Sequence, residues 1–289
     1  LLKLKPLFVF SKGGFVSVPP VVAAKILKIP VYTHECDFSP GLATKINSKF
    51  AKKILLSFES TTSFFTGPIK EKLVVTGNPV RPVFYNASAE KGKTFIGYDS
   101  IITKKPILFV MGGSLGAVQI NSLVKENLNW IKERFFIVHQ TGKQWAEELL
   151  PLKDDDYHPF PFIYNEMPDV MAAADVVLSR SGSNSLWECA VSKKPLILIP
   201  FSGSGTRGDQ VENAAFFEKY NAAMVLGGRL SDGSPSKDAS SENLKEALTI
   251  LSEEVKRKEF SQNVEKLVGN VKPAEYIANL IYGEVAEKL

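Results

Sequence analysis

Short apolar runs alternate with longer amphipathic segments along this chain of 289 residues. The runs Asp175–Leu178 and Pro195–Ile199 are typical, because they have the length and β-branched content of buried strands. Each is followed by a segment with the period of a helix. Strands and helices that alternate in this way predict parallel sheets with right-handed crossovers, so the expected fold class is α/β.

The elements fall into two series. The first has strands at 7–10, 30–33, 53–57 and 72–75, with helices at about 17–28 and 40–49. The second has strands at 106–111, 135–138, 160–163, 175–178, 195–199 and 222–226, with helices at about 116–129, 144–150, 166–173, 183–191 and 209–220. Helices at about 242–252, 254–268 and 273–288 follow.

A polar, glycine-containing connection at 86–105 separates the two series. We therefore expect two Rossmann-like domains, at 1–90 and 91–289, with terminal helices that pack back on the first. The first strand runs directly into a glycine turn, whereas a doubly wound domain seldom starts so late. We expect this first domain to be incomplete and an amino-terminal portion to be missing.

Composition adds a charge asymmetry to this picture. The 44% apolar and 23% charged residues are ordinary for a globular protein, and no apolar run has the length of a spanning helix. Two cysteines without metal spacing fit a reducing compartment. Through Tyr85 there are twelve basic and four acidic side chains, a net charge of +8, and the remainder carries −4 of the total of +4. This basic segment is either a solvated surface or one that attracts anionic lipids or a pyrophosphate substrate. We expect no nucleic-acid partner.

Polar groups follow two strands of the second series. The segments Ser179–Ala190 and Arg207–Ala214 both lie where a parallel sheet binds ligands, at strand carboxyl ends. Small residues around Gly182 let a backbone approach a phosphate, and the free N–H groups of the next helix favour an anion. Glu188 could accept hydrogen bonds from ribose hydroxyls. The grouping predicts a sugar-nucleotide donor site.

A glycine turn, Gly112–Ala117, follows the first strand of the same series. Its backbone N–H groups and the Ser114 hydroxyl could meet a diphosphate. The turn is not G-x-G-x-x-G, and the next strand runs into His139–Gly142 where a nicotinamide site would need an acidic residue. This argues against a nicotinamide cofactor. The alternative is a tight turn that serves packing alone.

Two further groups belong to the first series. Thr76–Arg81 brings the Asn78 amide and the Arg81 guanidinium to a rigid turn, which could also be purely structural. His34–Asp37 ends a strand beside the glycine turn Lys12–Phe15. A lone histidine is more often structural, but a carboxylate pair beside a glycine turn favours a functional site. Metal coordination is weakly signalled, and we expect no tightly bound metal or other cofactor.

Taken together, these motifs resemble those of the MurG family, the glycosyltransferases that move N-acetylglucosamine from UDP-N-acetylglucosamine to a lipid-linked muramoyl-peptide in peptidoglycan synthesis. The likeness is greatest to the Gram-positive versions and covers about residues 6–225. The segments that carry it are Phe10–Pro19, His34–Glu35, Gly41–Ala43, Gly77–Arg81, Gly112–Ala117, Arg180–Ser183 and Arg207–Gln210.

The resemblance implies a two-domain glycosyltransferase fold of the B type, with the acceptor on the first domain, the donor on the second and chemistry in the cleft. It implies that Arg81 and Ser114 lie near the phosphates, that Ile163 offers backbone to uracil and that Glu188 holds the ribose. Asp209 and Gln210 would face the sugar hydroxyls. The other donor-binding residues that it implies are Asn78, Gly113 and Ser183.

On the acceptor side the resemblance implies binding by Gly13, Gly14 and Phe15, with His34, Glu35 and Asp37 as catalytic candidates. Asp37 stands where many relatives carry Asn, and Phe15 where many carry Tyr. The family's amino-terminal glycine-rich loop, with its histidine, is absent from the sequence. We therefore expect the chain as written to bind the donor but to transfer the sugar very slowly or not at all. The expected place of work is the cytoplasmic face of the cell membrane, as a peripheral protein.

The expected chemistry is a single inverting displacement at the anomeric carbon, with UDP as the leaving group. Two alternatives stay open. One is a UDP-N-acetylglucosamine 2-epimerase, which needs no lipid acceptor. The other is a non-catalytic sugar-nucleotide-binding subunit that needs a partner to complete its site.

Overall fold

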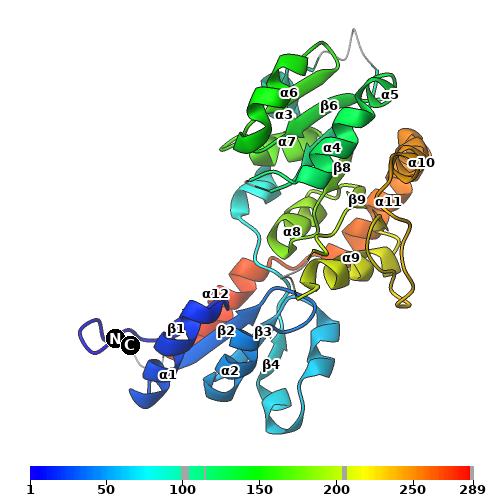
Figure 1. The fold of residues 1–289 in the computed structure, drawn as a ribbon. Coiled ribbons are helices and arrows are strands. Elements are labelled where there is room, and N and C mark those ends of the chain that lie inside the picture. Colours follow the sequence, from blue (N-terminus) through cyan, green and yellow to red (C-terminus); the bar gives the residue numbers. More distant parts are fainter. Residues whose placement is uncertain (99–103, 114, 204–206, 287–289) are drawn as a thin grey trace. The chain divides into compact units, whose positions relative to one another are not determined.

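The computed structural model describes residues 1–98, 104–113, 115–203 and 207–286, which form two compact units (Figure 1). Unit 1 comprises Leu1–Val80 and Asn270–Leu289, and unit 2 comprises Arg81–Gly269. Both contain a parallel sheet with helices, so the predicted α/β class is confirmed. Within the described residues, no helix combines the length and the apolar character that a membrane crossing requires.

Unit 1 is built on a four-stranded parallel sheet in the order β1-β2-β3-β4. Its strands are β1 (Val9–Ser11), β2 (Val31–Glu35), β3 (Lys53–Leu56) and β4 (Leu73–Val75). Its helices are α1 (Val18–Ile26), α2 (Leu42–Phe50) and α12 (Pro273–Val285), with short 3₁₀ helices at Phe15–Ser17, Glu59–Phe64 and Gly67–Lys72.

The two faces of this sheet are covered by different parts of the chain. Ile54 and Leu56 pack into the cluster that contains α1 residues, whereas Leu55 between them packs with residues of α12. This alternation is the period of two expected of a strand buried on both faces. The Tyr32 hydroxyl also donates to Glu284 Oε2 of α12 over 2.8 Å. Thus α12, which follows all of unit 2 in the chain, completes the core of unit 1.

Unit 2 has a six-stranded parallel sheet in the order β10-β9-β8-β5-β6-β7. Its strands are β5 (Ile107–Met111), β6 (Phe136–Gln140), β7 (Tyr157–Phe160), β8 (Val176–Ser179), β9 (Leu196–Leu198) and β10 (Ala223–Val225). Its helices are α3 (Ala89–Ile96), α4 (Val118–Glu126), α5 (Leu128–Lys132), α6 (Ala146–Leu149), α7 (Met167–Ala173), α8 (Ser183–Val191), α9 (Asp209–Lys219), α10 (Ser241–Ser252) and α11 (Glu254–Val268). Counted from β5, this is the doubly wound Rossmann order, whose switch point lies between β5 and β8.

The division between the units differs from the expected boundary at residue 90. The chain enters unit 2 at Arg81, because Ser88 N–H donates to Asp169 Oδ1 over 2.7 Å and α3 packs closely on α7. At Gly92 an added Cβ would lie 2.0 Å from the Asp169 carbonyl oxygen, which shows how near the two helices are. Of the terminal helices, α12 alone belongs to unit 1, and α10 and α11 stay with unit 2.

One helix was not predicted, and two predicted elements differ in position. Helix α3 lies inside the expected connection, with Ser88 accepting a hydrogen bond from Lys91 N–H at its start and Gly97 in the left-handed region at its end. Strand β7 begins three residues before the predicted 160–163, because Tyr157 pairs with Ile137 of β6. The helix predicted at 116–129 ends at Glu126, where Asn127 turns its side-chain amide back to the Leu123 carbonyl.

A buried chain of hydrogen bonds joins β7, β6 and α4. His139 Nδ1 lies 2.9 Å from Tyr157 Oη, and His139 Nε2 lies 3.1 Å from Asn121 Oδ1. The Asn121 amide nitrogen donates to the Thr141 carbonyl over 2.7 Å, so its oxygen faces the histidine. His139 Nε2 is therefore the protonated nitrogen, and Nδ1 accepts from the tyrosine hydroxyl. The chain fixes α4 against the end of β6.

Burial lowers the pKa of His139 to about 3, so the folded protein holds this imidazole neutral. An unfolded chain would protonate it near its ordinary pKa of 6.5. Since the unfolded state gains the proton first, this histidine costs stability as the pH falls below 6.5, and the loss continues towards pH 3.

We expect His139→Gln to flatten the dependence of unit 2 stability on pH. For wild type, the free energy of unfolding should fall by about 2 kcal/mol between pH 6.5 and pH 5 through this group alone. Urea unfolding followed by tryptophan fluorescence measures it, because Trp130, Trp145 and Trp187 all lie in unit 2. His158→Gln, at a half-buried position, is the control and should change the slope less. If the free energy of unfolding falls equally steeply with pH in His139→Gln and in wild type, this account is contradicted.

Candidate functional site

Two loops of unit 2 lie side by side at the switch point of the sheet. Strands β5 and β8 are paired up to Met111 and Ser179, so the segments that follow them begin as neighbours. One segment leads to α4 and the other to α8, and both helices start at the carboxyl edge of the sheet. This edge is where open α/β sheets bind their ligands, as the sequence predicted.

The loop after β5 needs glycine at three positions. An added Cβ at Gly112 would lie 2.3 Å from Ala117 N, and one at Gly116 would lie 2.1 Å from the Thr141 carbonyl oxygen. Gly113 has a φ of 87°, a left-handed conformation that L side chains rarely adopt. The loop can therefore present bare backbone to an anion at the start of α4. Ser114, the predicted phosphate contact, lies outside the described residues.

Arg180 braces the loop after β8. One of its guanidinium nitrogens, Nη1, lies 3.0 Å from Gln119 Oε1 of α4, 2.9 Å from the Ile199 carbonyl and 3.2 Å from the Pro200 carbonyl. It thus joins the segments that follow β8 and β9 to α4. The motif that contains Arg180 does not by itself predict this role. Ser183, predicted to bind the donor, is buried at the first position of α8.

Glu188 on α8 is already paired. Its Oε1 accepts from Arg81 Nε over 3.0 Å, and the Glu188 side chain is 19% exposed whereas that of Arg81 is 59% exposed. Burial raises the pKa of Glu188, although the charge and the hydrogen bond of Arg81 act in the opposite direction. The two residues lie 107 positions apart, and the sequence assigned them to ribose and phosphate without predicting that they meet.

The predicted sugar-binding pair begins α9. Asp209 Oδ2 binds Arg207 Nη2 over 2.9 Å, while Oδ1 is buried and accepts no hydrogen bond from the part of the chain that the structure describes. Gln210 Oε1 accepts from Phe201 N–H over 3.0 Å, and its carbonyl accepts from the Ser181 hydroxyl over 2.7 Å. The start of α9 is therefore tied to the loop after β8.

Ile163 lies in the loop after β7 and is 2% exposed. Its N–H donates to Gln140 Oε1 over 3.0 Å, so the backbone group left to a ligand is its carbonyl. No hydrogen bond to this carbonyl comes from the residues described. The segment His139–Gly142 predicts no function for Gln140, since nothing local to it reveals a contact across strands.

In unit 1, the turn Gly13–Gly14 follows β1 with φ values of 84° and 77°. Ser11 Oγ accepts from Gly13 N–H over 3.1 Å, and the Ser17 hydroxyl donates to the Gly14 carbonyl over 2.7 Å. Phe15, the next residue, is 85% exposed. The predicted acceptor-binding residues therefore form a braced turn that presents an apolar side chain to the outside.

His34 is completely buried near this turn and uses both ring nitrogens. Nε2 lies 3.1 Å from the Gly77 carbonyl, to which it must donate, and Nδ1 lies 3.1 Å from Lys12 Nζ. Burial, followed by the charge of Lys12, lowers the pKa of His34 to about 3. The imidazole is therefore neutral at physiological pH and joins the glycine turn to the segment after β4.

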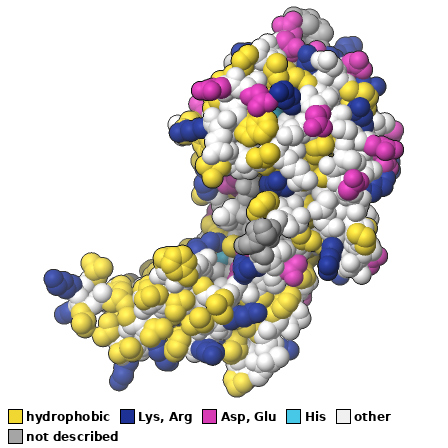
Figure 2. All heavy atoms as spheres, viewed as in Figure 1, with side chains coloured by type: hydrophobic (Ala, Val, Ile, Leu, Met, Phe, Trp, Pro, Cys, Tyr) yellow, Lys and Arg dark blue, Asp and Glu magenta, His cyan; other side chains and the backbone are white. Residues whose placement is uncertain are grey.

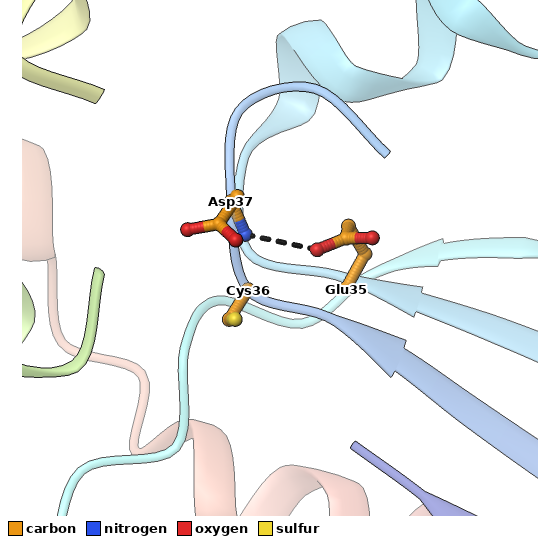
Figure 3. A group of neighbouring side chains, drawn as sticks. All are labelled: Glu35, Cys36 and Asp37. Atoms are coloured by element: carbon orange, nitrogen blue, oxygen red, sulfur yellow. Dashed lines mark hydrogen bonds between the residues drawn. The ribbon is translucent and has the colours of Figure 1, made fainter. Parts of the chain in front are cut away.

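Figure 3 shows Glu35, Cys36 and Asp37 at the end of β2, with ligand atoms within 4.8 Å of one another. Glu35 Oε1 accepts from Asp37 N–H over 3.2 Å, and Oε2 accepts from Gly41 N–H over 3.0 Å. Burial, with the nearby carboxylates, raises the pKa of Cys36 to about 11, so its thiol stays protonated at neutral pH. Both carboxylate oxygens of Glu35 thus accept backbone N–H groups, and they hold the turn that follows β2.

The predicted donor residues thus gather in unit 2 with one exception. Asn78 belongs to unit 1, where it is 1% exposed and its Oδ1 accepts from Ser57 Oγ over 3.3 Å and Lys12 Nζ over 3.4 Å. Its amide oxygen therefore lies in the same buried group as His34. Arg81, three residues later, is the first residue of unit 2.

Comparison with known sequences gives two family matches. The description Glycosyltransferase family 28 C-terminal domain matches residues 107–268, and Glycosyltransferase family 28 N-terminal domain matches residues 1–56.

Two relatives carry the name UDP-N-acetylglucosamine--N-acetylmuramyl-(pentapeptide) pyrophosphoryl-undecaprenol N-acetylglucosamine transferase. The protein from Treponema denticola is 49% identical over 78% of this chain and 60% of its own length. One from Bacillus cereus is 44% identical over 78% of this chain and 62% of its own length. The chain therefore spans about three fifths of the length of these relatives.

Among solved structures, MurG from Acinetobacter baumannii has a TM-score of 0.71 at 24% identity, covering 98% of this chain and 76% of its own. UDP-GlcNAc 2-epimerase from Neisseria meningitidis, bound to UDP-GlcNAc, has a TM-score of 0.66 at 15% identity, covering 98% and 78%. Both likenesses concern the fold. Because the C-terminal family description alone matches more than half of the residues, this chain belongs to glycosyltransferase family 28.

Proposed function

We propose that this chain moves N-acetylglucosamine from UDP-N-acetylglucosamine to a polyprenyl-pyrophosphate-linked muramoyl-peptide. The observation that carries the proposal is the switch point of unit 2, where a glycine turn follows β5, α8 follows β8, and Glu188 of α8 is paired with Arg81. The relatives that are 49% and 44% identical to this chain over the aligned residues are named for the same transfer.

The donor fits this site group by group. The diphosphate faces the N–H groups at Gly113 and the start of α4, while Glu188 accepts from the ribose hydroxyls. The buried Asp209 Oδ1 is an acceptor for a sugar hydroxyl. When the donor binds, Arg81 leaves Glu188 Oε1 and pairs with the diphosphate. The ion pair between Arg81 and Glu188 is thus replaced by an ion pair between Arg81 and the diphosphate and by a hydrogen bond from the ribose to Glu188.

The reaction is a single displacement with inversion. The acceptor hydroxyl oxygen forms a bond to the anomeric carbon while the bond from that carbon to the phosphate oxygen breaks, and UDP leaves with the electron pair. Arg81 and the backbone N–H groups at the helix starts stabilise the developing charge on the diphosphate. A base takes the proton of the acceptor hydroxyl.

Unit 1 supplies the acceptor side in this proposal. The Gly13–Gly14 turn presents backbone and Phe15 to the acceptor. His34 uses both nitrogens and Glu35 both oxygens in holding the turns, so we assign these two to positioning. We propose Asp37, in the segment that follows β2, as the base.

We expect Glu188→Ala to weaken UDP binding by about 10–100-fold, because the ribose hydroxyls lose a charged acceptor. Isothermal titration calorimetry with UDP measures the loss. Arg81→Gln should weaken the binding of UDP more than the binding of uridine, because the proposed partner of Arg81 is the diphosphate. Glu147→Ala, at an exposed position of α6, is the control. Unchanged UDP affinity in a folded Glu188→Ala protein would remove this residue from the site.

The transfer itself is tested with radiolabelled UDP-N-acetylglucosamine, with and without the lipid-linked acceptor. Any label transferred should lie in the lipid product with inverted anomeric configuration, at a low rate for the chain as written, and we expect no manno epimer from the donor alone. Epimer formed without acceptor would favour the 2-epimerase alternative. Donor binding without either product would favour a binding subunit instead.

We further propose that unit 1 attaches this protein to the cytoplasmic face of the cell membrane. Exposed apolar side chains lie among basic ones here, as Figure 2 shows for the visible face of unit 1. They include Leu2, Leu4, Phe15, Val16, Ile26 and Leu42. Lysine ammonium groups meet anionic headgroups while the apolar side chains enter the interface.

The double variant Lys25→Glu/Lys45→Glu should reduce binding to phosphatidylglycerol vesicles about 10-fold or more at low salt, since each lysine contributes on the order of 1 kcal/mol. The difference should shrink at high salt, where the charges are screened. Vesicle cosedimentation measures binding, and Lys143→Glu/Lys153→Glu in unit 2 is the matched control. Binding that ignores both lipid charge and salt would refute the electrostatic attachment.

A further inference from the structure

Gln140 ends β6, the strand that lies between β5 and β7 in the sheet of unit 2. Its side chain is 2% exposed and contacts the loops that follow both neighbouring strands. On one side, Nε2 donates to the Gly113 carbonyl over 3.4 Å. On the other, Oε1 accepts from Ile163 N–H over 3.0 Å. One buried amide therefore joins two loops whose strands, β5 and β7, are not neighbours in the sheet.

The two partners fix the orientation of this amide. A carbonyl oxygen can only accept and an N–H can only donate, so the amide nitrogen must face Gly113 and the amide oxygen must face Ile163. Glutamine has the length that this position requires, and its amide supplies both the hydrogen-bond donor and the acceptor. A methionine of similar length offers neither, and an ionised glutamate offers acceptors alone, which places a negative charge against the Gly113 carbonyl.

The Ile163 N–H is used by Gln140, so its carbonyl is the group that can meet a nucleobase. Uracil carries a donor at N3, which matches a carbonyl acceptor, whereas cytosine carries an acceptor there. A carbonyl held in one direction therefore favours uracil. If the peptide group were free to rotate, its N–H could meet the cytosine N3 instead.

We infer that Gln140 is a positioning residue that holds the loop facing the base and the loop facing the diphosphate in one arrangement, and that it thereby sets the preference for a uracil nucleotide. This inference rests on the proposed function, with the diphosphate at the loop after β5 and the uracil at the Ile163 backbone that the sequence resemblance implies. It extends that function by naming what determines base selectivity and what couples base recognition to diphosphate binding.

The experiment compares Gln140→Met and Gln140→Glu with wild type, using UDP and CDP as probes in calorimetric titrations at pH 8 and pH 5.5. Gln140→Met should weaken UDP about 10-fold or more and reduce the ratio of CDP to UDP dissociation constants by a similar factor, since a site loses discrimination when its polar group is free to turn. Gln144→Met, at an exposed position four residues later, is the control and should leave both unchanged.

Gln140→Glu gives a readout that loss of packing would not produce. At pH 8 the carboxylate keeps the acceptor for Ile163 but repels the Gly113 carbonyl, so UDP binding weakens while the preference over CDP is largely retained. At pH 5.5 the buried carboxyl group takes a proton and can donate to Gly113, so its UDP affinity should recover relative to wild type measured at the same pH.

A ligand-free measurement accompanies the titrations. The Ile163 amide should exchange its hydrogen faster in Gln140→Met than in wild type. If Gln140→Met binds UDP as tightly as wild type, with the same selectivity over CDP and the same hydrogen exchange rate at the Ile163 amide, the inference is overturned while the proposed function stands. If that variant does not fold, absence of the pH-dependent recovery in Gln140→Glu overturns it. Failure of wild type to bind UDP would overturn the proposed function, and the inference with it.

Discussion

Burial of both faces of the parallel sheets decides where chemistry can occur in this protein. Every residue of β2, β5 and β6 is buried, so the strands offer a ligand nothing but their ends. Parallel strands bring all their carboxyl ends to one edge, and helices begin there with unpaired N–H groups. The glycine turns after β1 and β5, the carboxylates after β2 and the polar starts of α8 and α9 all follow from this constraint.

Most polar groups at these edges already have protein partners. Arg180 joins the segments after β8 and β9 to α4, Gln140 joins the loops after β5 and β7, and Glu188 is paired with Arg81. Such groups are costly to leave unpaired when they are buried. In the proposed function, a donor binds by exchanging partners, and its affinity is the free energy of its own hydrogen bonds and ion pairs less that of the protein's pairs that it replaces.

The sequence predicts the parts of this arrangement that depend on local pattern. Apolar runs locate nearly all strands, and glycines at 112, 113 and 116 predict the turn because φ and close backbone approach exclude other residues. Helix α3 is short and lies in a polar stretch, and β7 contains a proline, so both give weak periodicity. The pairing of Arg81 with Glu188 and the bridge made by Gln140 depend on tertiary packing, which no local pattern encodes. For His34 the residue types indicated chemistry, whereas the geometry engages both nitrogens.

The return of α12 to unit 1 has a consequence for the nascent chain. Residues Tyr32 and Leu55 pack against Ile277, Ile281 and Val285, which the ribosome adds only after the whole of unit 2. Unit 2 is continuous and can close its core as it emerges, while one face of the earlier unit 1 sheet stays open to solvent. Unit 1 can therefore complete its core only after unit 2 has been synthesised, and until then the face of its sheet that carries Tyr32 and Leu55 has no cover from α12.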